Sequence, residues 1–404
     1  MNINKLLAAL AVAMLFFFTS CDDKDKDTTN PLTPTDSQAK LENIGIALAN
    51  EINVADFQEV VDLMNDFGEI AESLQEDVFQ TESTVNSLKK VVSKNDLKAL
   101  AGMMKTSAMA VPEDYYNTYY RTMTYDETTG EWVESANANA LELRFKSGGK
   151  DAVISGTISD DYYTVTVDGT DVYVPKTATT SIKLGGVELL KFIVSVPALS
   201  SSSNKVSATL THAKSNITWT ADVDVTTNSS LMSAAVKKGT KTLISAKITT
   251  DVNGFLVNDG DEINDIVLDI VMPGKTVYEM NVMDELFIRA ECSDVEDFVQ
   301  AMNELDEDNN LSREAYCEAQ KNLFNQYLKI YFSYVANMSV KEGDLYYDYT
   351  ITEVDGETSV EMVFGIQFAD GSKHKLEDFF TKDSFANFID AMEQLATDFQ
   401  NLVE

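Results

Sequence analysis

The sequence predicts an α+β fold in which helices precede and follow one long series of β-strands. Near both ends of the chain, apolar residues recur every three or four positions, which is typical of amphipathic helices. The middle of the chain instead alternates apolar and polar residues, with turn-forming residues between the runs. We therefore expect a large curved antiparallel β meander of roughly 8–10 strands, with amphipathic N- and C-terminal helices packed on one face.

The first helical region is expected over residues 38–112. Its apolar positions keep spacings of three and four: Leu41, Ile44, Leu48, Ile52, Phe57, Val60, Val61, Met64, Phe67 and Leu74, and then Leu97, Leu100, Met103 and Met104 in a third short helix. Pro112 ends this region, because proline lacks the backbone N–H that a helix interior needs.

The β meander is expected over residues 113–283. Alternation is clear at 141–145 and again at 217–225. A faint internal repeat lies within it, because Gly185, Leu189, Leu190 and Val194 recur with the same spacing as Gly239, Leu243, Ile244 and Ile248. Each copy predicts a turn followed by a long strand, although two copies do not establish a repeat protein.

Residues 284–404 are expected to hold helices and one hairpin, and to complete a single α+β body over residues 38–404. The expected elements are a helix capped by Ser312 and running to Val335, a hairpin of strands 345–351 and 360–368, and a last helix from Phe385 to Leu402.

The charge balance excludes some partners. The chain has 31 Lys and Arg against 66 Asp and Glu, and its formal net charge is −35. Nucleic-acid affinity comes largely from basic residues that neutralise phosphates, so we expect no nucleic-acid partner. The same argument disfavours flat binding to anionic lipid.

The residues that most enzymes use are scarce. His212, in a predicted strand, and His374, in a polar loop, are the only histidines. They leave little room for a histidine-based triad or a zinc site. With 66 acidic residues, some carboxylate pair is always available, so no pair stands out. We therefore name no catalytic residue and expect no cofactor.

One acidic loop partly resembles a calcium loop. Oxygen-bearing side chains stand at alternate positions, namely Asp306, Asp308, Asn310 and Ser312. Leu311 occupies the position where the loop needs glycine, and Cys317 the position of the bidentate glutamate. We expect no metal site there.

Aromatic clusters leave two interpretations open. They are Tyr115, Tyr116, Tyr119 and Tyr120, then Trp132, Tyr162 and Tyr163, and then Tyr346, Tyr347 and Tyr349. Exposed rings on a sheet could stack on sugars, whereas tyrosine is also a common strand residue that simply packs.

Apart from Cys21, the cysteines are Cys292 and Cys317, both on predicted helices. The sequence does not decide whether these two cysteines form a disulfide or remain free thiols.

Residues 1–20 follow the plan of a secretory signal peptide. Lys5 precedes an uninterrupted apolar run from Leu6 to Phe18, and Thr19 and Ser20 follow. The run is too short for a membrane span, which needs about 20 apolar residues. Removal of the segment would take away Lys5, its one charged residue, and move the net charge from −35 to −36.

The next residues resemble the lipobox of bacterial lipoproteins. Phe18, Thr19 and Ser20 lead into Cys21, and the resemblance implies that Cys21 is acylated and becomes the new N-terminus. Several acyl chains hold a protein firmly on a bilayer without a transmembrane helix. The implied partner is therefore a membrane, reached through the lipid on Cys21.

An acidic segment follows Cys21: Asp22, Asp23, Lys24, Asp25, Lys26 and Asp27. It is similar to the export signal that sends lipoproteins of the Bacteroidetes to the outer face of the outer membrane, and a periplasm-facing leaflet is the alternative. Thr28 resembles the O-glycosylation acceptor of those bacteria. Residues 21–37 are expected to form a disordered acidic, Thr- and Pro-containing tether.

These features favour a lipid-anchored, non-catalytic envelope protein that binds an unidentified ligand, such as a glycan or a lipid-like molecule. The alternatives are a carrier with an apolar groove for a lipid-like ligand, a structural or adhesion component, and a glycan hydrolase.

Overall fold

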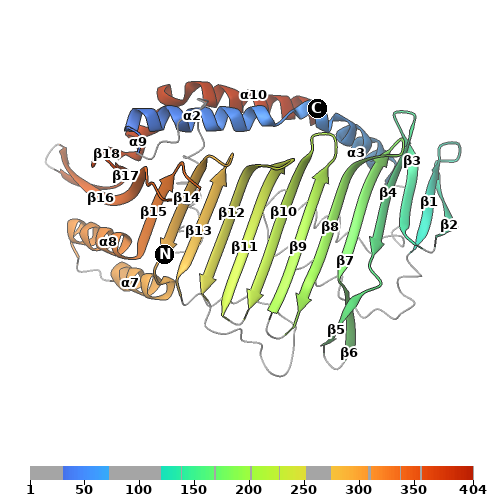
Figure 1. Cartoon of the computed structure of the whole chain (residues 1–404), viewed down its shortest axis with the longest axis horizontal. Coiled ribbons are helices and arrows are strands. Elements are labelled where there is room, and N and C mark those ends of the chain that lie inside the picture. Colours follow the sequence, from blue (N-terminus) through green and yellow to red (C-terminus); the bar gives the residue numbers. More distant parts are fainter. Residues whose placement is uncertain are drawn as a thin grey trace. The chain divides into compact units, whose positions relative to one another are not determined.

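The computed structural model describes residues 31–71, 120–137, 139–167, 170–200, 203–226, 228–251, 274–307, 311–336, 338–354 and 357–403. It confirms the predicted α+β class, with mostly antiparallel strands and terminal helices that pack together (Figure 1). The chain divides into two compact units, where the sequence predicts one body. Among the described residues, the first unit holds those up to 54 and from 218 onward, and the second holds those from 55 to 217.

The first unit contains a meander of neighbouring strands. Their order is β18-β17-β16-β15-β14-β13-β12-β11-β10, and every pair from β11 to β18 is antiparallel. The strands are β10 (Ile217–Thr226), β11 (Ser229–Lys238), β12 (Lys241–Asp251), β13 (Thr276–Val282), β14 (Leu286–Cys292), β15 (Leu328–Ser333), β16 (Gly343–Val354), β17 (Glu357–Phe368) and β18 (Lys373–Lys375). The predicted C-terminal hairpin is confirmed as β16 and β17.

The terminal helices of this unit are α2 (Pro34–Glu51) and α10 (Ala386–Val403), which lie side by side (Figure 1). Leu41, Ile44 and Leu48 of α2 belong to the main buried cluster. Its strand residues include Leu243, Val282, Leu286, Phe332 and Phe368. These residues start or end strands that run in alternating directions, so the helices pack near one end of the strands.

The N-terminal end of α2 is fixed to the sheet by buried polar groups. The backbone N–H of Leu32 donates to Oε2 of Glu342 at 2.6 Å, and the hydroxyls of Ser37 and Tyr334 are 2.8 Å apart. Burial raises the pKa of Glu342, which is only 1% exposed. The helix begins at Pro34, inside the segment expected to be tether, because Thr33 caps it and proline suits a first helical turn.

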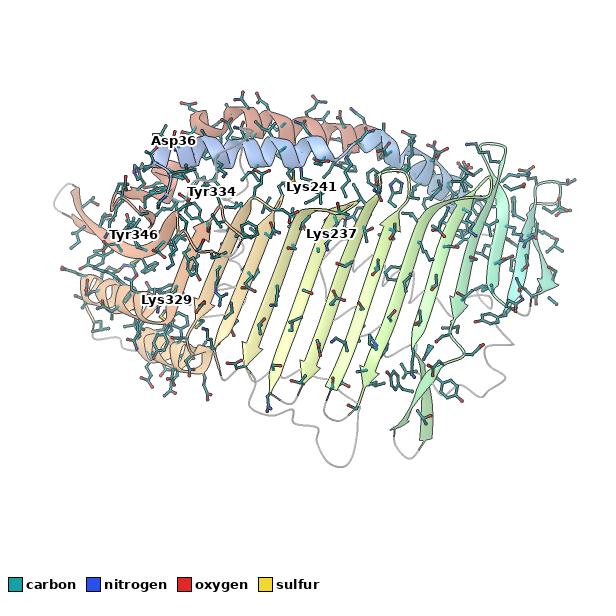
Figure 2. The ribbon with its side chains drawn as sticks, viewed as in Figure 1. Asp36, Lys237, Lys241, Lys329, Tyr334 and Tyr346 are labelled. Atoms are coloured by element: carbon teal, nitrogen blue, oxygen red, sulfur yellow. The ribbon has the colours of Figure 1, made fainter. Side chains whose placement is uncertain are left out.

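The C-terminal end of α2 is held by two lysines. Nζ of Lys238 donates to the carbonyl oxygen of Glu51 at 2.7 Å. Nζ of Lys241, a residue labelled in Figure 2, lies 3.0 Å from Oε1 of Glu51. Cations are favourable at this end because the helix dipole is negative there. Hydrogen bonds from the same lysines lower the pKa of the Glu51 carboxyl.

Helices α7 (Val295–Glu307) and α8 (Arg313–Tyr327) lie between β14 and β15 in the chain. Ser312 caps α8, as predicted, by accepting from the Ala315 N–H at 3.2 Å. The expectation that this helix continues to Val335 is wrong, because Leu328–Ser333 forms β15. The apolar residues of this segment fit both the spacing of a helix and the alternation of a strand. Pairing with β14 makes the segment a strand.

The second unit has the strand order β9-β8-β7-β4-β3-β1-β2 and a separate β5–β6 hairpin. Its strands are β1 (Arg121–Asp126), β2 (Glu131–Ala136), β3 (Leu141–Ser147), β4 (Lys150–Ile158), β5 (Tyr162–Val167), β6 (Thr170–Pro175), β7 (Thr177–Leu184), β8 (Val187–Leu199) and β9 (Ser203–His212). The pair β1–β3 is parallel. Thirteen described strands thus lie between residues 121 and 282, more than the roughly 8–10 predicted, because short polar strands such as β2 lack a clear alternation.

A short 3₁₀ helix, η1 (Val54–Phe57), leads into α3 (Gln58–Ala71), which packs on the sheet of the second unit. Leu63 of α3 has no exposed surface. It joins Phe145, Leu184 and Leu189 in a separate buried cluster. Each unit therefore has its own core.

The two copies of the internal repeat have similar local structure. Gly185 and Gly239 both adopt a φ of 58°, which favours glycine, at the start of a tight turn between long strands. A β-bulge precedes each turn, at Ile182/Lys183 and at Val236/Lys237. The predicted arrangement of a turn followed by a long strand is confirmed for both copies.

Candidate functional site on the polar sheet face

Strands β11 to β15 of the first unit present one apolar and one polar face. Residues directly opposite each other on neighbouring strands share a face. One row contains Met232, Ile248, Tyr278, Ala290 and Ile330, and the next row contains Ser233, Lys247, Glu279, Arg289 and Tyr331. The buried cluster under α2 uses Met280, Ile288 and Phe332, which share the apolar face. The helix therefore packs on the side opposite the charged residues.

Five side chains of the polar face form an ion-pair ladder: Lys247, Glu279, Arg289, Glu291 and Lys275. Nζ of Lys247 lies 3.4 Å from Glu279, and Nη1 of Arg289 lies 2.7 Å from the same carboxylate. Nε of Arg289 lies 2.6 Å from Glu291, which Nζ of Lys275 approaches to 2.9 Å. Each carboxylate therefore contacts two cations.

The electrostatics of the ladder stabilise its charged form. The hydrogen bond from Lys275, together with that from Arg289, lowers the pKa of Glu291, and Glu291 raises the pKa of Arg289. Lys329, directly opposite Glu291 on β15, is exposed (Figure 2). Among the described residues it has no ion-pair partner, so it adds an uncompensated cation beside the ladder.

Tyr331 and Tyr346 of the first unit each carry a lysine over the ring. Nζ of Lys341 lies 4.0 Å from the ring centroid of Tyr331, and Nζ of Lys373 lies 4.6 Å from that of Tyr346 (Figure 2). The Tyr346 ring also occupies the space where a Cβ on Gly365 would project. Lys373 and the backbone at Gly365 therefore both lie against the Tyr346 ring. The ring is poorly placed to stack on a sugar, and the lysine is the group presented to a ligand.

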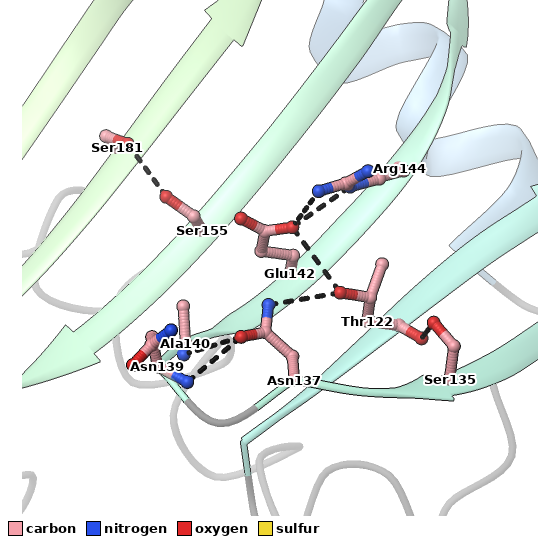
Figure 3. Close-up of polar contacts among 9 residues, drawn as sticks. All are labelled: Thr122, Ser135, Asn137, Asn139, Ala140, Glu142, Arg144, Ser155 and Ser181. Carbon is pink, nitrogen blue, oxygen red and sulfur yellow. Dashed lines mark hydrogen bonds and ion pairs between the residues drawn. The ribbon is translucent and has the colours of Figure 1, made fainter.

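The second unit has a polar row of a different character (Figure 3). Oε2 of Glu142 accepts from Nε of Arg144 at 2.9 Å and from the Thr122 hydroxyl at 3.4 Å, and Nδ2 of Asn137 donates to that hydroxyl at 3.1 Å. The hydroxyls of Ser155 and Ser181 are 2.9 Å apart. These groups satisfy one another, which is a structural role.

Most aromatic residues of the predicted clusters are used for packing. Tyr115, Tyr116 and Tyr119 lie outside the described residues. Trp132 donates its Nε1–H to the Ile70 carbonyl at 3.3 Å, and Tyr347 stacks on Phe324 with centroids 4.3 Å apart. Tyr120 and Tyr163 donate to backbone oxygens, and a lysine lies over the rings of Tyr346 and Tyr349. Tyr162 is 42% exposed.

The cysteines do not form a reactive site. Cys317 lies on α8, as predicted, whereas Cys292 ends β14 and is not helical. Both are free thiols, so the disulfide that the sequence left open is not formed. Burial raises the pKa of Cys292 to about 11, and a thiol that rarely ionises is a poor nucleophile.

The histidines occupy unrelated settings. His212 ends β9 and has no exposed surface. Its ring stacks on Phe57 with centroids 4.4 Å apart, and its Nδ1 lies 2.7 Å from the Ser215 hydroxyl. Burial lowers the pKa of His212, against the opposing effect of Asp56. His374 lies on β18, not in a loop as predicted.

The His212 environment predicts a pH dependence of stability. The unfolded chain takes up the proton near pH 6.5, whereas the buried imidazole resists it. Stability should therefore be full above pH 7 and decrease as the pH falls below 6.5. His212→Phe keeps the stacking but removes the titrating group. Thermal unfolding of the variant should consequently lose less stability between pH 7.5 and 5.5 than the wild type does. His374→Gln is the matched control, and equal losses in all three proteins would contradict the prediction.

Of the four oxygen-bearing residues of the calcium-like loop, the structure describes Asp306 and Ser312. Asp308 and Asn310 lie outside the described residues. Asp306 accepts a hydrogen bond from the Tyr316 hydroxyl at 2.6 Å, and Ser312 caps α8. The part of the chain that the structure describes contains no group of three or more His, Cys, Asp or Glu side chains placed to hold a metal.

An open depression of about 440 Å³ lies beside the β1–β2 hairpin. Its lining residues are Thr124, Tyr125, Asp126, Glu127, Thr128, Val133 and Lys146. The Asp126 carboxylate is engaged by the Thr128 N–H at 2.8 Å, and that hydrogen bond lowers the pKa of Asp126. The depression therefore has one carboxylate that is already engaged within the hairpin.

The residues of the predicted lipid anchor, from Cys21 through Asp27 to Thr28, lie outside the described part of the chain. No helix among the described residues is long and apolar enough to span a membrane.

No family model, curated protein or solved structure matches the chain.

The sequence analysis missed the ion-pair ladder. A signal was present, because Glu279 and Arg289 lie symmetrically about a short acidic turn at 283–285, and a hairpin there places them opposite each other. The contribution of Lys247 needed the register between β12 and β13, which are separated by a long connection.

Proposed function

We propose that the chain is a lipid-anchored protein of a bacterial cell envelope, displayed outward, that binds a ligand on the polar face of the first unit and catalyses no reaction. The ion-pair ladder is the observation that carries the binding function. It gathers charged side chains from neighbouring strands on the face opposite α2. The proposed cellular location rests on the signal peptide, the lipobox ending at Cys21 and the acidic segment that follows it.

The chemistry of the ladder favours binding over hydrolysis. A glycan hydrolase of the common kind needs a carboxylic acid that can donate a proton near neutral pH. Glu291 has a lowered pKa because Lys275 and Arg289 bind its ionised form. Glu279 likewise contacts two cations. Paired carboxylates of this kind accept hydrogen bonds from a ligand more readily than they donate protons to it.

A lipid carrier is the second candidate. Met232 and Ile248 on the apolar face are only half-buried, so this face continues past the cluster under α2. Beneath α2, however, the helix fills the apolar face with its own Leu41, Ile44 and Leu48. The adhesion and hydrolase alternatives have no comparable support.

Surface capture of polysaccharides tests the proposal. Cells that express the wild type, incubated with a panel of fluorescent neutral and anionic polysaccharides, should retain at least one of them above cells that lack the protein. Cys21→Ser removes the acylated residue, so the protein should leave the membrane fraction and capture should fall to background.

Cys292→Ser is the matched control, because it makes the same chemical change at a thiol far from the anchor in the sequence. Its capture and membrane fractionation should equal those of the wild type. Retention of the Cys21→Ser protein in membranes, or the absence of any capture by the wild type, would refute the proposal.

A further inference from the structure

We infer that the polar face of the first unit binds a polyuronate, a polysaccharide with one carboxylate on each of many sugars, laid across strands β12 to β15. The inference rests on the proposed function and names the ligand class of the same face. Three properties support it: the local charge, the alternation of bases and acids, and the covered aromatic rings.

The local charge is opposite to that of the whole chain. The chain has 31 basic and 66 acidic residues. Within strands β12 to β15, four bases, Lys247, Lys275, Arg289 and Lys329, accompany three acids, Glu279, Glu291 and Asp251, in the ladder and beside it. The side chains of Lys247 and Lys275 are each 46% exposed. The excess of bases is confined to strands β12 to β15, with Asp222 of β10 and Asp344 of β16 beyond it on either side, so a negatively charged ligand would be attracted to these four strands.

The arrangement suits a ligand whose charges are sparse. Lys247, Glu279 and Arg289 lie directly opposite one another on β12, β13 and β14. Lys329 lies on β15, opposite Glu291 and two residues from the position opposite Arg289. Strands are about 4.8 Å apart, so these four strands span roughly 14 Å. Cations can pair with the carboxylates of a polyuronate, while the intervening glutamates accept hydrogen bonds from sugar hydroxyls.

The same features disfavour other ligand classes. A densely charged polyanion would place negative groups against Glu279 and Glu291, where like charges repel. A neutral glycan would leave the exposed lysines without a ligand partner. Stacking of sugars is disfavoured at Tyr346, because Gly365 and Lys373 lie against its ring. The carboxylate of Asp222 accepts from the Ser233 hydroxyl at 3.5 Å, so a negative charge lies at the β10 end of the row. An anionic ligand is therefore expected over β12 to β15 and not over β10.

Titration calorimetry on the full chain, purified in detergent, tests the inference. The probe is polygalacturonate, and the comparison polymers are uncharged galactan and heparin, which is densely charged. We expect polygalacturonate to bind most tightly and its affinity to fall as salt is raised. The double variant Lys247→Gln, Lys329→Gln should bind it about tenfold more weakly, since each exposed ionic contact contributes a modest amount.

The matched control is Lys176→Gln. Lys176 also pairs with a carboxylate, that of Asp161 at 2.9 Å, and also lies over a tyrosine ring, that of Tyr163 at 5.0 Å. It lies between β6 and β7 of the second unit, outside the ladder, so its replacement should leave affinity unchanged. A second double variant, Lys247→Arg, Lys329→Arg, should retain binding because it keeps both charges.

Four outcomes would overturn the inference: no binding of polygalacturonate, equal binding of galactan, tighter binding of heparin, or equal losses in the Lys176→Gln and ladder variants. These are distinct from failure of the proposed function. If cells capture only a neutral polysaccharide through the protein, surface binding stands and the polyuronate assignment falls.

Discussion

Replacement of Phe332 by alanine is expected to lower the free energy of unfolding of the first unit by about 3–5 kcal/mol. The Phe332 side chain has no exposed surface and lies in the cluster that joins α2 to the sheet. It packs edge-on against Tyr334 and Phe368, and it fills the space next to Gly343. The truncation leaves a cavity that these neighbours cannot close without moving backbone. Chemical denaturation, with amide exchange in β14 and β15 as the local readout, measures the loss.

Phe364→Ala is the matched control, since it removes the same ring from a neighbouring part of the same unit. Phe364 is 43% exposed and touches Tyr347 at one edge. Its loss should cost less than about 1 kcal/mol. Similar destabilisation by the two variants would show that the buried ring of Phe332 contributes no more to stability than the exposed ring of Phe364.

The fold class was predictable because it depends on residue periodicity, which is local. Leu41, Ile44 and Leu48 mark one helical face, and the alternation at 141–145 and 217–225 marks strands that the structure confirms. Local patterns do not determine everything, however. Leu328 to Phe332 fits both a helix and a strand, and hydrogen bonds to β14, whose residues lie about 40 positions earlier, make it a strand.

The candidate site was harder to predict for the same reason. Charged residues in strands are common, and their alternation shows only that one face is polar. Whether Lys247, Glu279 and Arg289 meet depends on the pairing register of β12, β13 and β14. A shift of one strand by one residue would turn its charged side chain to the other face of the sheet. The aromatic clusters drew more attention in the sequence, yet most of those rings pack within the protein, as at Trp132 and Tyr347.

The helix positions and the site are connected through the two faces of the sheet. In the first unit, α2 packs on the apolar face and is held at its N-terminal end by Glu342 and Tyr334. The segment that leads to the proposed lipid anchor precedes this end. Among the described residues, α2 packs on the face opposite the ladder, so anchoring through the segment before α2 and ligand binding on the ladder face need not compete for the same surface.

Leu63→Ala is the second substitution with a large expected effect, about 2–5 kcal/mol of lost stability in the second unit. Leu63 has no exposed surface and is the α3 residue at the centre of the cluster with Phe145, Leu184 and Leu189. Because each unit has its own core, faster amide exchange should be greatest in α3, β3 and β4. The strands β13 to β15 should keep most of their protection.

Met64 provides the control for this argument, because it is the next residue of the same helix and is 44% exposed. Met64→Ala alters helix propensity little and removes few contacts, so it should change stability by less than about 0.5 kcal/mol. If Leu63→Ala accelerated exchange equally in β3 and β14, the two units would unfold as one cooperative body, and the separate cores would not correspond to separate folding units.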